Sequence, residues 1–308
     1  MALLRVSPGV SRNGTMINTG GPGPGSQDRH KVGETDVSGG TMTATAPQTR
    51  CGPAQEKRGK EHDAVIGLVL AAGAGRRLRP YTAALPKALV PVDGDTTILD
   101  IALRNLAQVG LTDVVVVVGY AAGAVRERRA ELERRHGVRL ELVHSDRAEE
   151  WNNAYSLWLA AEHLSAGALL LNGDTVHPVA VERTLLAERG PHLLLAVDAA
   201  KRLGEEEMKV RFDPVTGQLT QIHKSLDPAT ADGEYIGAAI IEPAAAAGLG
   251  EALEATWRRD PGLYYEDGFA EYGRRGGQVR GARLGAVEWV EVDDHADLAR
   301  AREIACRC

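Results

Sequence analysis

Cysteines and long apolar runs are both scarce in this sequence. Its three cysteines, Cys51, Cys306 and Cys308, include no C-x-x-C pair. The sequence therefore predicts neither a disulfide framework nor a zinc site, and it favours a reducing cytoplasm. No apolar run reaches the roughly 18 residues of a membrane span, and the apolar part of MALLRVSPGV is too short for a signal peptide. We expect a cytoplasmic protein with no membrane partner.

An excess of positive charge is also missing. The 308 residues hold 36 Lys and Arg against 42 Asp and Glu, which gives a net charge of −6. This balance argues against a nucleic-acid partner bound through bulk charge. Aromatic residues make up only 4%, but 44% of the chain is hydrophobic, which is enough for one or two globular domains with a sizeable core. The composition leaves the oligomeric state open.

The first 60 residues lack hydrophobic periodicity. They contain GGPGPGSQ and SGGTMTATAPQTR, which are rich in Gly, Pro, Ser and Thr. Such a composition cannot bury enough apolar surface to fold. We expect a disordered tail over 1–60 and a folded domain over 61–308. Both Met1 and Met42 fit the start of the protein.

From Val65 onward, apolar strands alternate with amphipathic helices. Strands are expected at 64–70, 112–120, 138–145, 167–174 and 191–199, and helices at 96–110, 122–137, 152–164 and 177–190. This alternation predicts an α/β fold with a doubly wound, mostly parallel sheet that is covered on both faces. Two strands around a Pro-Val-Thr-Gly turn within 208–226, and another over 234–242, make the sheet mixed.

The first strand leads into LAAGAGRRLRPYTAALPK, Leu70–Lys87. Ligands of open α/β sheets bind beyond the carboxyl ends of the strands. Gly73 and Gly75, after Ala72, let the backbone approach a ligand, and Arg76 begins a run of positive charge. The loop predicts a polyphosphate cradle, and the alternative is a surface loop with solvated arginines. It contains neither a P-loop nor G-x-G-x-x-G.

This loop resembles the signature of the nucleotidyltransferases that make activated sugars and alcohols, G-x-G-x-R-[LF]-x-P-x-T-x-x-x-P-K-x-[LM]. Its fixed positions are occupied by Gly73, Gly75, Arg77, Leu78, Pro80, Thr82, Pro86, Lys87 and Leu89. The resemblance extends over roughly 65–305 and implies a Rossmann-like fold of the GT-A-like type. It also implies a reaction in which an NTP and a phosphorylated acceptor give a nucleoside-diphospho product and pyrophosphate. Arg77 would hold the leaving pyrophosphate and Lys87 the α-phosphate.

Phosphoryl transfer of this kind requires a hard divalent cation, which we expect to be Mg²⁺. Asp174, in ALLLNGD, resembles the first metal aspartate of the family. WVEVDD supplies Glu291 and Asp293, which face the same side by strand alternation. Either one fits the second metal ligand, whereas Asp294 is expected to cap the following helix. No enzyme nucleophile is required, because a phosphate acceptor is largely dianionic near pH 7.

The segments EEWNNAYSLWLA and GEEEMKV resemble those of the small cytidylyltransferases that act on phosphocholine or phosphonates. The resemblance favours CTP, with Asn153 and Ser156 bonded to the pyrimidine edge.

The same resemblance predicts a small phosphorylated alcohol or a phosphonate as acceptor. Lys224 would grip its phosphate, and the expected acceptor site also includes Lys209, Tyr235 and Glu266.

Acids and tyrosines in YYED, including Glu266, could surround a cationic head group. The alternative is that these residues form an ordinary helix N-terminus. The rival functions are a sugar-1-phosphate nucleotidyltransferase using dTTP, UTP or GTP, and an inactive nucleotide-binding regulatory domain.

Overall fold

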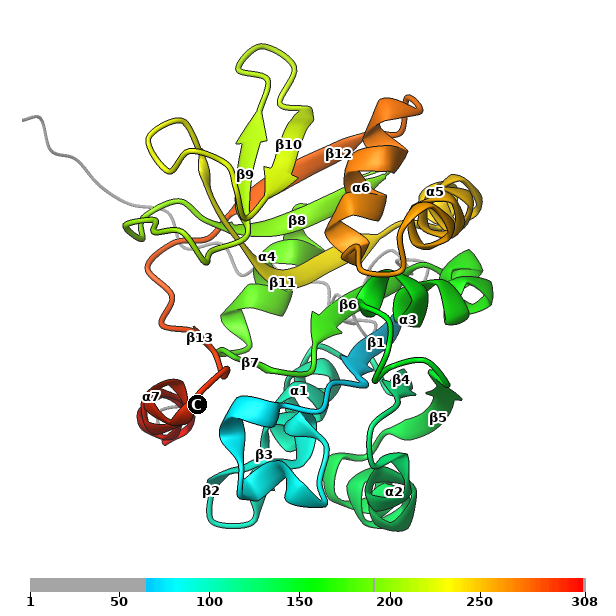
Figure 1. The fold of residues 1–308 in the computed structure, drawn as a ribbon, viewed down its shortest axis with the longest axis vertical. Helices are drawn as coiled ribbons and strands as arrows, with labels where there is room; N and C mark the ends of the chain where they lie inside the picture. Colours follow the sequence, from blue (N-terminus) through cyan, green and yellow to red (C-terminus); the bar gives the residue numbers. More distant parts are fainter. Residues whose placement is uncertain (1–64, 191, 307–308) are drawn as a thin grey trace, which may run out of the picture. The chain divides into compact units, whose positions relative to one another are not determined.

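The computed structural model describes residues 65–190 and 192–306. The expected tail over 1–60 lies outside these residues. A nine-stranded sheet runs through the described domain in the order β10-β9-β11-β6-β1-β4-β5, and β8 and β12 extend from β11 (Figure 1). Its strands are β1 (Ile66–Ala71), β4 (Asp113–Val118), β5 (Arg139–His144), β6 (Ala168–Asn172), β8 (Leu193–Asp198), β9 (Lys209–Phe212), β10 (Leu219–His223), β11 (Gly233–Ile241) and β12 (Val279–Arg283).

The sheet is mixed, as the sequence predicted. Strand β1 pairs in parallel with β4 and β6, and β4 pairs in parallel with β5. The antiparallel strand β11 joins this parallel half to β8, β9 and β10. Two small antiparallel ladders complete the pairing: β2 (Pro91–Asp93) with β3 (Thr96–Thr97), and β7 (Thr175–Val176) with β13 (Val290–Glu291).

Helices cover both faces of the sheet. One core contains side chains from α1 (Ile98–Gln108), α2 (Ala122–His136) and α4 (Ala180–Ala187). The other contains side chains from α3 (Asn153–Leu159), α5 (Ala246–Arg259) and α6 (Tyr265–Arg274). The valines of β4 alternate between the two cores, so that Val116 faces one and Val117 the other. Burial on both faces explains the continuous apolar run of this strand.

Local signals set the helix ends. Thr97 and Asp100 form a reciprocal capping box at the start of α1, and Gly137 ends α2 with a φ of 67°. Asp294 caps α7 (His295–Ala305), as expected, by accepting from the amides of Ala296 and Asp297. Helix α7 packs with β2 and β13 in a third apolar cluster.

Five short 3-10 helices complete the described domain: η1 (Arg76–Leu78), η2 (Tyr81–Ala83), η3 (Lys87–Leu89), η4 (Ala161–Ala166) and η5 (Pro243–Ala245). Within residues 65–190 and 192–306, every helix is too short or too polar to cross a membrane.

Candidate active site

The loop after β1 folds back on itself and fixes Lys87. The Lys87 amide donates to the carbonyl of Gly73 over 3.1 Å, and the Thr82 hydroxyl donates to the carbonyl of Gly75 over 2.7 Å. Gly75 has a φ of 56°, and a Cβ there would lie 3.0 Å from the Cβ of Lys87. Glycine at this position therefore allows both the left-handed turn and the close approach of Lys87.

The ammonium group of Lys87 lies between two carboxylates from distant parts of the chain. Its Nζ is 2.9 Å from Asp174 Oδ2 and 2.5 Å from Asp293 Oδ1. Arg77, from the same loop, contacts the other oxygen of Asp293 over 2.7 Å. Lys87 is buried, with 8% of its surface exposed, whereas the Arg77 side chain is 68% exposed.

The short ladder between β7 and β13 brings the acidic residues together. Thr175 pairs with Glu291, and the Val292 amide donates to the Asp174 carbonyl over 2.8 Å. As a result, oxygens of Asp174, Glu291 and Asp293 lie within 4.8 Å of one another. The two stretches are more than a hundred residues apart in sequence, and this pairing brings them side by side.

The charges in this cluster shift one another's pKa values. Burial alone would lower the pKa of Lys87, but attraction to Asp174 and Asp293 raises it above its usual value. Burial would raise the pKa of Asp293, and Lys87 and Arg77 instead hold it below its usual value. Desolvation and repulsion from Asp174 raise the pKa of Glu291 to about 7. In the described part of the chain, Lys87 and Arg77 form ion pairs with Asp174 and Asp293 but not with Glu291.

The three carboxylates fit a divalent cation. Oxygen ligands suit Mg²⁺, and three acids within one small volume gain from a cation that offsets their repulsion. Asp174 Oδ1 is buried and accepts no hydrogen bond from the described part of the chain. Both Glu291 and Asp293 reach the cluster with Asp174, so the geometry leaves both as possible second ligands.

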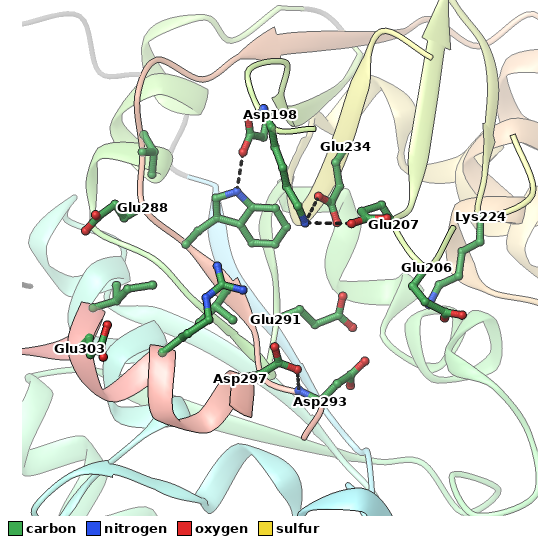
Figure 2. Close-up of a pocket in the computed structure, with 16 residues that line it drawn as sticks. Asp198, Glu206, Glu207, Lys224, Glu234, Glu288, Glu291, Asp293, Asp297 and Glu303 are labelled. Atoms are coloured by element: carbon green, nitrogen blue, oxygen red, sulfur yellow. Dashed lines mark hydrogen bonds and ion pairs between the residues drawn. The ribbon is translucent and has the colours of Figure 1, made fainter. Parts of the chain in front are cut away.

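A cavity of about 450 Å³ opens beside this cluster. Figure 2 shows Glu291 and Asp293 toward one end and Glu207 and Glu234 toward the other, with Lys224 on a side wall. At the Glu234 end, the Lys201 ammonium lies 2.8 Å from Glu234 Oε2 and 3.3 Å from Glu207 Oε1.

Trp289 also lines this cavity, and its indole N–H donates to Asp198 over 2.8 Å. The cavity wall is thus predominantly acidic around one aromatic side chain. Trp289 is two residues before Glu291, and the sequence analysis did not single it out.

Lys209 is bonded to groups within the protein. Its side chain is fully buried, and its Nζ donates to three backbone carbonyls, those of Gly204, Glu205 and Glu207, over 2.9–3.1 Å. These three bonds use all of its N–H groups. In this structure the side chain therefore fixes the loop before β9, and its contact with an acceptor oxyanion stays a prediction.

Asn153 and Ser156 also have partners within the protein. The side-chain oxygen of Asn153 accepts from the Tyr265 amide over 2.9 Å and joins α3 to α6. Ser156 is buried and its hydroxyl lies 2.9 Å from that of Ser145. In this structure the Asn153 oxygen and the Ser156 hydroxyl are thus bonded to other protein groups, and their contact with a pyrimidine edge stays a prediction.

Tyr235 is buried in the core rather than open to a ligand. Its hydroxyl accepts from that of Tyr265 over 3.1 Å, and Tyr265 also contacts Asn172. Acceptor binding by Tyr235 stays a prediction. The local signal, a tyrosine in an apolar strand, was that of a core residue.

Lys224 and Glu266 line a second, smaller cavity of about 40 Å³ together with Tyr264. The Lys224 ammonium lies 5.8 Å from the centre of the Tyr264 ring. Glu266 is buried, and its Oε2 has no hydrogen-bond partner in the described residues. Burial raises its pKa to about 8. Asp267, by contrast, caps α6 by accepting from the Tyr264 amide.

A third cavity, of about 230 Å³, lies beside the glycine–arginine loop. It is lined by Ala74, Arg76, Arg79, Thr82, Tyr120 and Glu149. Tyr120 follows the carboxyl end of β4 and donates its hydroxyl hydrogen to the Ala83 carbonyl over 2.9 Å. The sequence analysis missed Tyr120 and Glu149, although Tyr120 has the expected signal, a position directly after a buried parallel strand. Ala72, whose carbonyl accepts from the Tyr120 amide, and Gly73 border this region.

Comparison with known proteins agrees with this geometry. Residues 66–189 match the family described as nucleotidyl transferase. Residues 66–189 are thus similar to nucleotidyl transferases.

Three curated relatives are, by name, two cytidylyltransferases and a CMP-phosphonate synthase. The CMP-5'-(3-aminopropyl)phosphonate synthase of Streptomyces rubellomurinus is 32% identical over 77% of this chain and 38% of its own length. The choline-phosphate cytidylyltransferase of Streptococcus pneumoniae is 37% identical over 35% of this chain and 43% of its own length. The 2-aminoethylphosphonate cytidylyltransferase of Lancefieldella rimae is 31% identical over 37% of this chain and 44% of its own length. The chain thus spans less than half the length of these relatives.

Two solved structures share the fold of this chain. The inositol-1-phosphate CTP transferase of T. maritima has a TM-score of 0.66 and 21% identity, over 78% of this chain and 96% of its own. The CTP:phosphocholine cytidylyltransferase of Streptococcus pneumoniae has a TM-score of 0.59 and 22% identity, over 79% of this chain and 99% of its own. The expectation of a Rossmann-like nucleotidyltransferase fold is confirmed.

Proposed function

We propose that this chain is a Mg²⁺-dependent cytidylyltransferase. It joins CTP to a small phosphorylated alcohol or phosphonate and releases pyrophosphate. The observation that carries the proposal is the position of Lys87. This phosphate-loop lysine lies at the carboxyl end of β1, within 3 Å of Asp174 and Asp293. Lys87, the cation proposed to bind the α-phosphate, thus lies beside acids that suit a metal. Nucleotidyl transfer requires both groups close together.

The reaction requires no covalent enzyme intermediate. An oxygen of the acceptor phosphate or phosphonate forms a bond to the α-phosphorus of CTP while the bond from that phosphorus to the β-phosphate oxygen breaks. Lys87 stabilises the charge that develops on the α-phosphoryl oxygens, and Arg77 holds the leaving pyrophosphate. Mg²⁺, when bound by Asp174 with Glu291 or Asp293, supplies further charge neutralisation. Gly73, Gly75 and Arg76 shape the phosphate-binding loop.

The acceptor is assigned to the side of the site that holds Lys224. Lys224 lines both the 450 Å³ cavity and the smaller cavity of Glu266, which supports a role for its ammonium in holding the acceptor oxyanion. The large cavity is lined by nine carboxylates and three basic side chains, which favours a cationic head group over a neutral sugar. Three of the relatives named above act on phosphocholine or aminoalkylphosphonates, according to their names.

A panel of nucleotides and acceptors tests the proposal. CTP, UTP, dTTP and GTP are each combined with phosphocholine, 2-aminoethylphosphonate, 2-hydroxyethylphosphonate and hexose-1-phosphates, and the initial rate of pyrophosphate release is measured. We expect the highest rate for CTP with an ammonium-bearing acceptor. A higher rate for hexose-1-phosphates with UTP, dTTP or GTP would establish the sugar-nucleotide alternative. No pyrophosphate release from any pair, with CTP still bound, would instead indicate the regulatory domain.

A further inference from the structure

The two cations of the phosphate loop are both engaged by acids of the metal cluster. Lys87 contacts Asp174 Oδ2 and Asp293 Oδ1, and Arg77 contacts Asp293 Oδ2, all within 2.9 Å. We name these four residues the latch: Arg77, Lys87, Asp174 and Asp293. In the latch, three of the four carboxylate oxygens of the two aspartates already have a positive partner.

The latch oxygens are the ones that a divalent cation needs. Asp174 and Asp293, with Glu291, are the acids whose oxygens lie within 4.8 Å of one another. An ammonium at 2.5–2.9 Å from two of these oxygens lies where a metal would coordinate. Two positive charges so close repel each other strongly in a partly buried site. Lys87 and the metal therefore compete for the same carboxylates.

A triphosphate offers the latch cations another partner. Lys87 and Arg77 belong to the glycine–arginine loop, and a triphosphate on that loop carries several negative charges to which both can turn. Once they turn, Asp174 and Asp293 are free to hold the cation. The exchange needs only a rotation of two long side chains, and the Lys87 backbone stays bonded to Gly73.

We infer that the Lys87 ammonium occupies the metal site in the nucleotide-free protein. Binding of a nucleotide and binding of a divalent cation therefore strengthen each other. This inference rests on the proposed function, which makes a nucleoside triphosphate the ligand of the loop. Linkage is reciprocal, because a nucleotide that raises metal affinity is itself bound more tightly by the same factor when the metal is present. Without nucleotide, the protein would thus bind the divalent cation weakly, and little of it would hold the metal alone.

The test measures Mn²⁺ binding to the full chain without nucleotide, by titration calorimetry or by the electron paramagnetic resonance of free Mn²⁺. Lys87→Met removes the ammonium and keeps most of the apolar stem. We expect this variant to bind Mn²⁺ at least about tenfold more tightly than the parent protein, within the range of typical linkage. Lys87→Arg keeps the charge and should stay near the parent value.

Lys224→Met is the matched control. This substitution also removes one positive charge near Glu291, because the Lys224 ammonium acts to lower the pKa of Glu291. In the described residues, however, Lys224 forms no ion pair with Asp174 or Asp293. We expect it to tighten Mn²⁺ binding less than about threefold, well below the typical linkage range. An equal effect of Lys87→Met and Lys224→Met would overturn the inference, because it would show a general effect of charge. An unchanged Mn²⁺ affinity in Lys87→Met would also overturn it.

Melting temperature supplies a second measurement in case Lys87→Met is destabilised. In Lys87→Met, Asp174 and Asp293 repel each other because the Lys87 ammonium is gone. Mn²⁺ should therefore raise the melting temperature of this variant more than that of the parent protein. An equal Mn²⁺ shift in both proteins would contradict the inference. Failure of the proposed function would be seen separately. If the protein transfers no cytidylyl group but shows the expected Mn²⁺ binding, the inference about the latch stands and the proposed reaction is wrong.

Discussion

At the scale of single residues, the site depends on how one glycine and one lysine fit together. Gly75 turns with a positive φ and leaves no space for a Cβ beside Lys87, and Lys87 in turn reaches two carboxylates. The spacing of both residues in the loop made them predictable from the sequence. The ion pairs were not predictable, because they depend on β13 lying against β7.

Lys87→Ala should lower turnover strongly while the fold is retained. The lysine is proposed to stabilise charge that develops on the α-phosphoryl oxygens, and such a contact contributes on the order of 10²–10³-fold to kcat. Steady-state kinetics of pyrophosphate release, with circular dichroism as the check on folding, measures the effect. Turnover equal to that of the parent would remove Lys87 from the reaction.

Asp174→Asn should raise the Mg²⁺ concentration that half-maximal activity requires. The substitution keeps the shape of the side chain and removes the negative charge that a divalent cation prefers. Rates measured over a Mg²⁺ series in the parent and the variant provide the comparison. Full activity of the parent protein in excess EDTA would rule out the metal-dependent mechanism.

Glu266→Gln should change how stability depends on pH. The folded protein raises the pKa of this buried carboxyl from 4.5 to about 8, so it holds the proton more tightly than the unfolded chain. The stability of the parent relative to the Gln variant is therefore greatest below pH 4.5 and falls as the pH rises toward 8. The full change is on the order of 5 kcal/mol.

Urea unfolding of both proteins at several pH values measures this difference. The Gln variant remains neutral throughout and has no such loss. A stability difference that is constant from pH 4 to pH 9 would show that the carboxyl titrates normally in the folded state.

At the scale of elements, strand ends and helix caps were predictable, and contacts between elements were not. Asp174 after β6 and Asp294 before α7 each carry a local signal, an acid after a buried strand and an acid at a helix start. The backbone partners of Lys209 depend on how the loop just before it folds, and the partner of Asn153 comes from α6, 112 residues away. The local sequence gives no comparable signal for either contact.

Asn153→Ala should weaken the contact between α3 and α6 without affecting nucleotide choice. It leaves the Tyr265 amide without its partner, at a cost of about 1–2 kcal/mol of unfolding free energy. Chemical denaturation measures the cost, and KM values for CTP and UTP test the nucleotide preference. A selective rise in the KM for CTP, with unchanged stability, would restore Asn153 to the base-binding site.

At the scale of the whole molecule, the alternating pattern after Val65 was sufficient to predict a sheet covered on both faces. The two cores on the two faces explain why the strands have continuous apolar runs. The order of the antiparallel strands could not be read from the sequence, since it depends on which edges pair. The sequence also did not show that the β7–β13 ladder would join the metal acids.

Residues 1–60 are predicted to be dispensable, because their composition offers no pattern for packing. A chain that begins at Glu61 should keep the melting temperature and the turnover of the full chain. Differential scanning fluorimetry and the pyrophosphate assay test both properties. A several-fold loss of activity, or a clear drop in melting temperature, would give this segment a role.

The central claim is the transfer of a cytidylyl group to a phosphorylated or phosphonate acceptor. It is tested most directly by ³¹P NMR of the products formed from CTP and 2-aminoethylphosphonate with Mg²⁺. We predict equal amounts of pyrophosphate and of a new phosphonate–phosphate anhydride, as CTP and the phosphonate disappear together. Conversion of CTP to CMP and pyrophosphate with the phosphonate signal unchanged would contradict the account, as would the absence of any reaction with phosphocholine or either phosphonate.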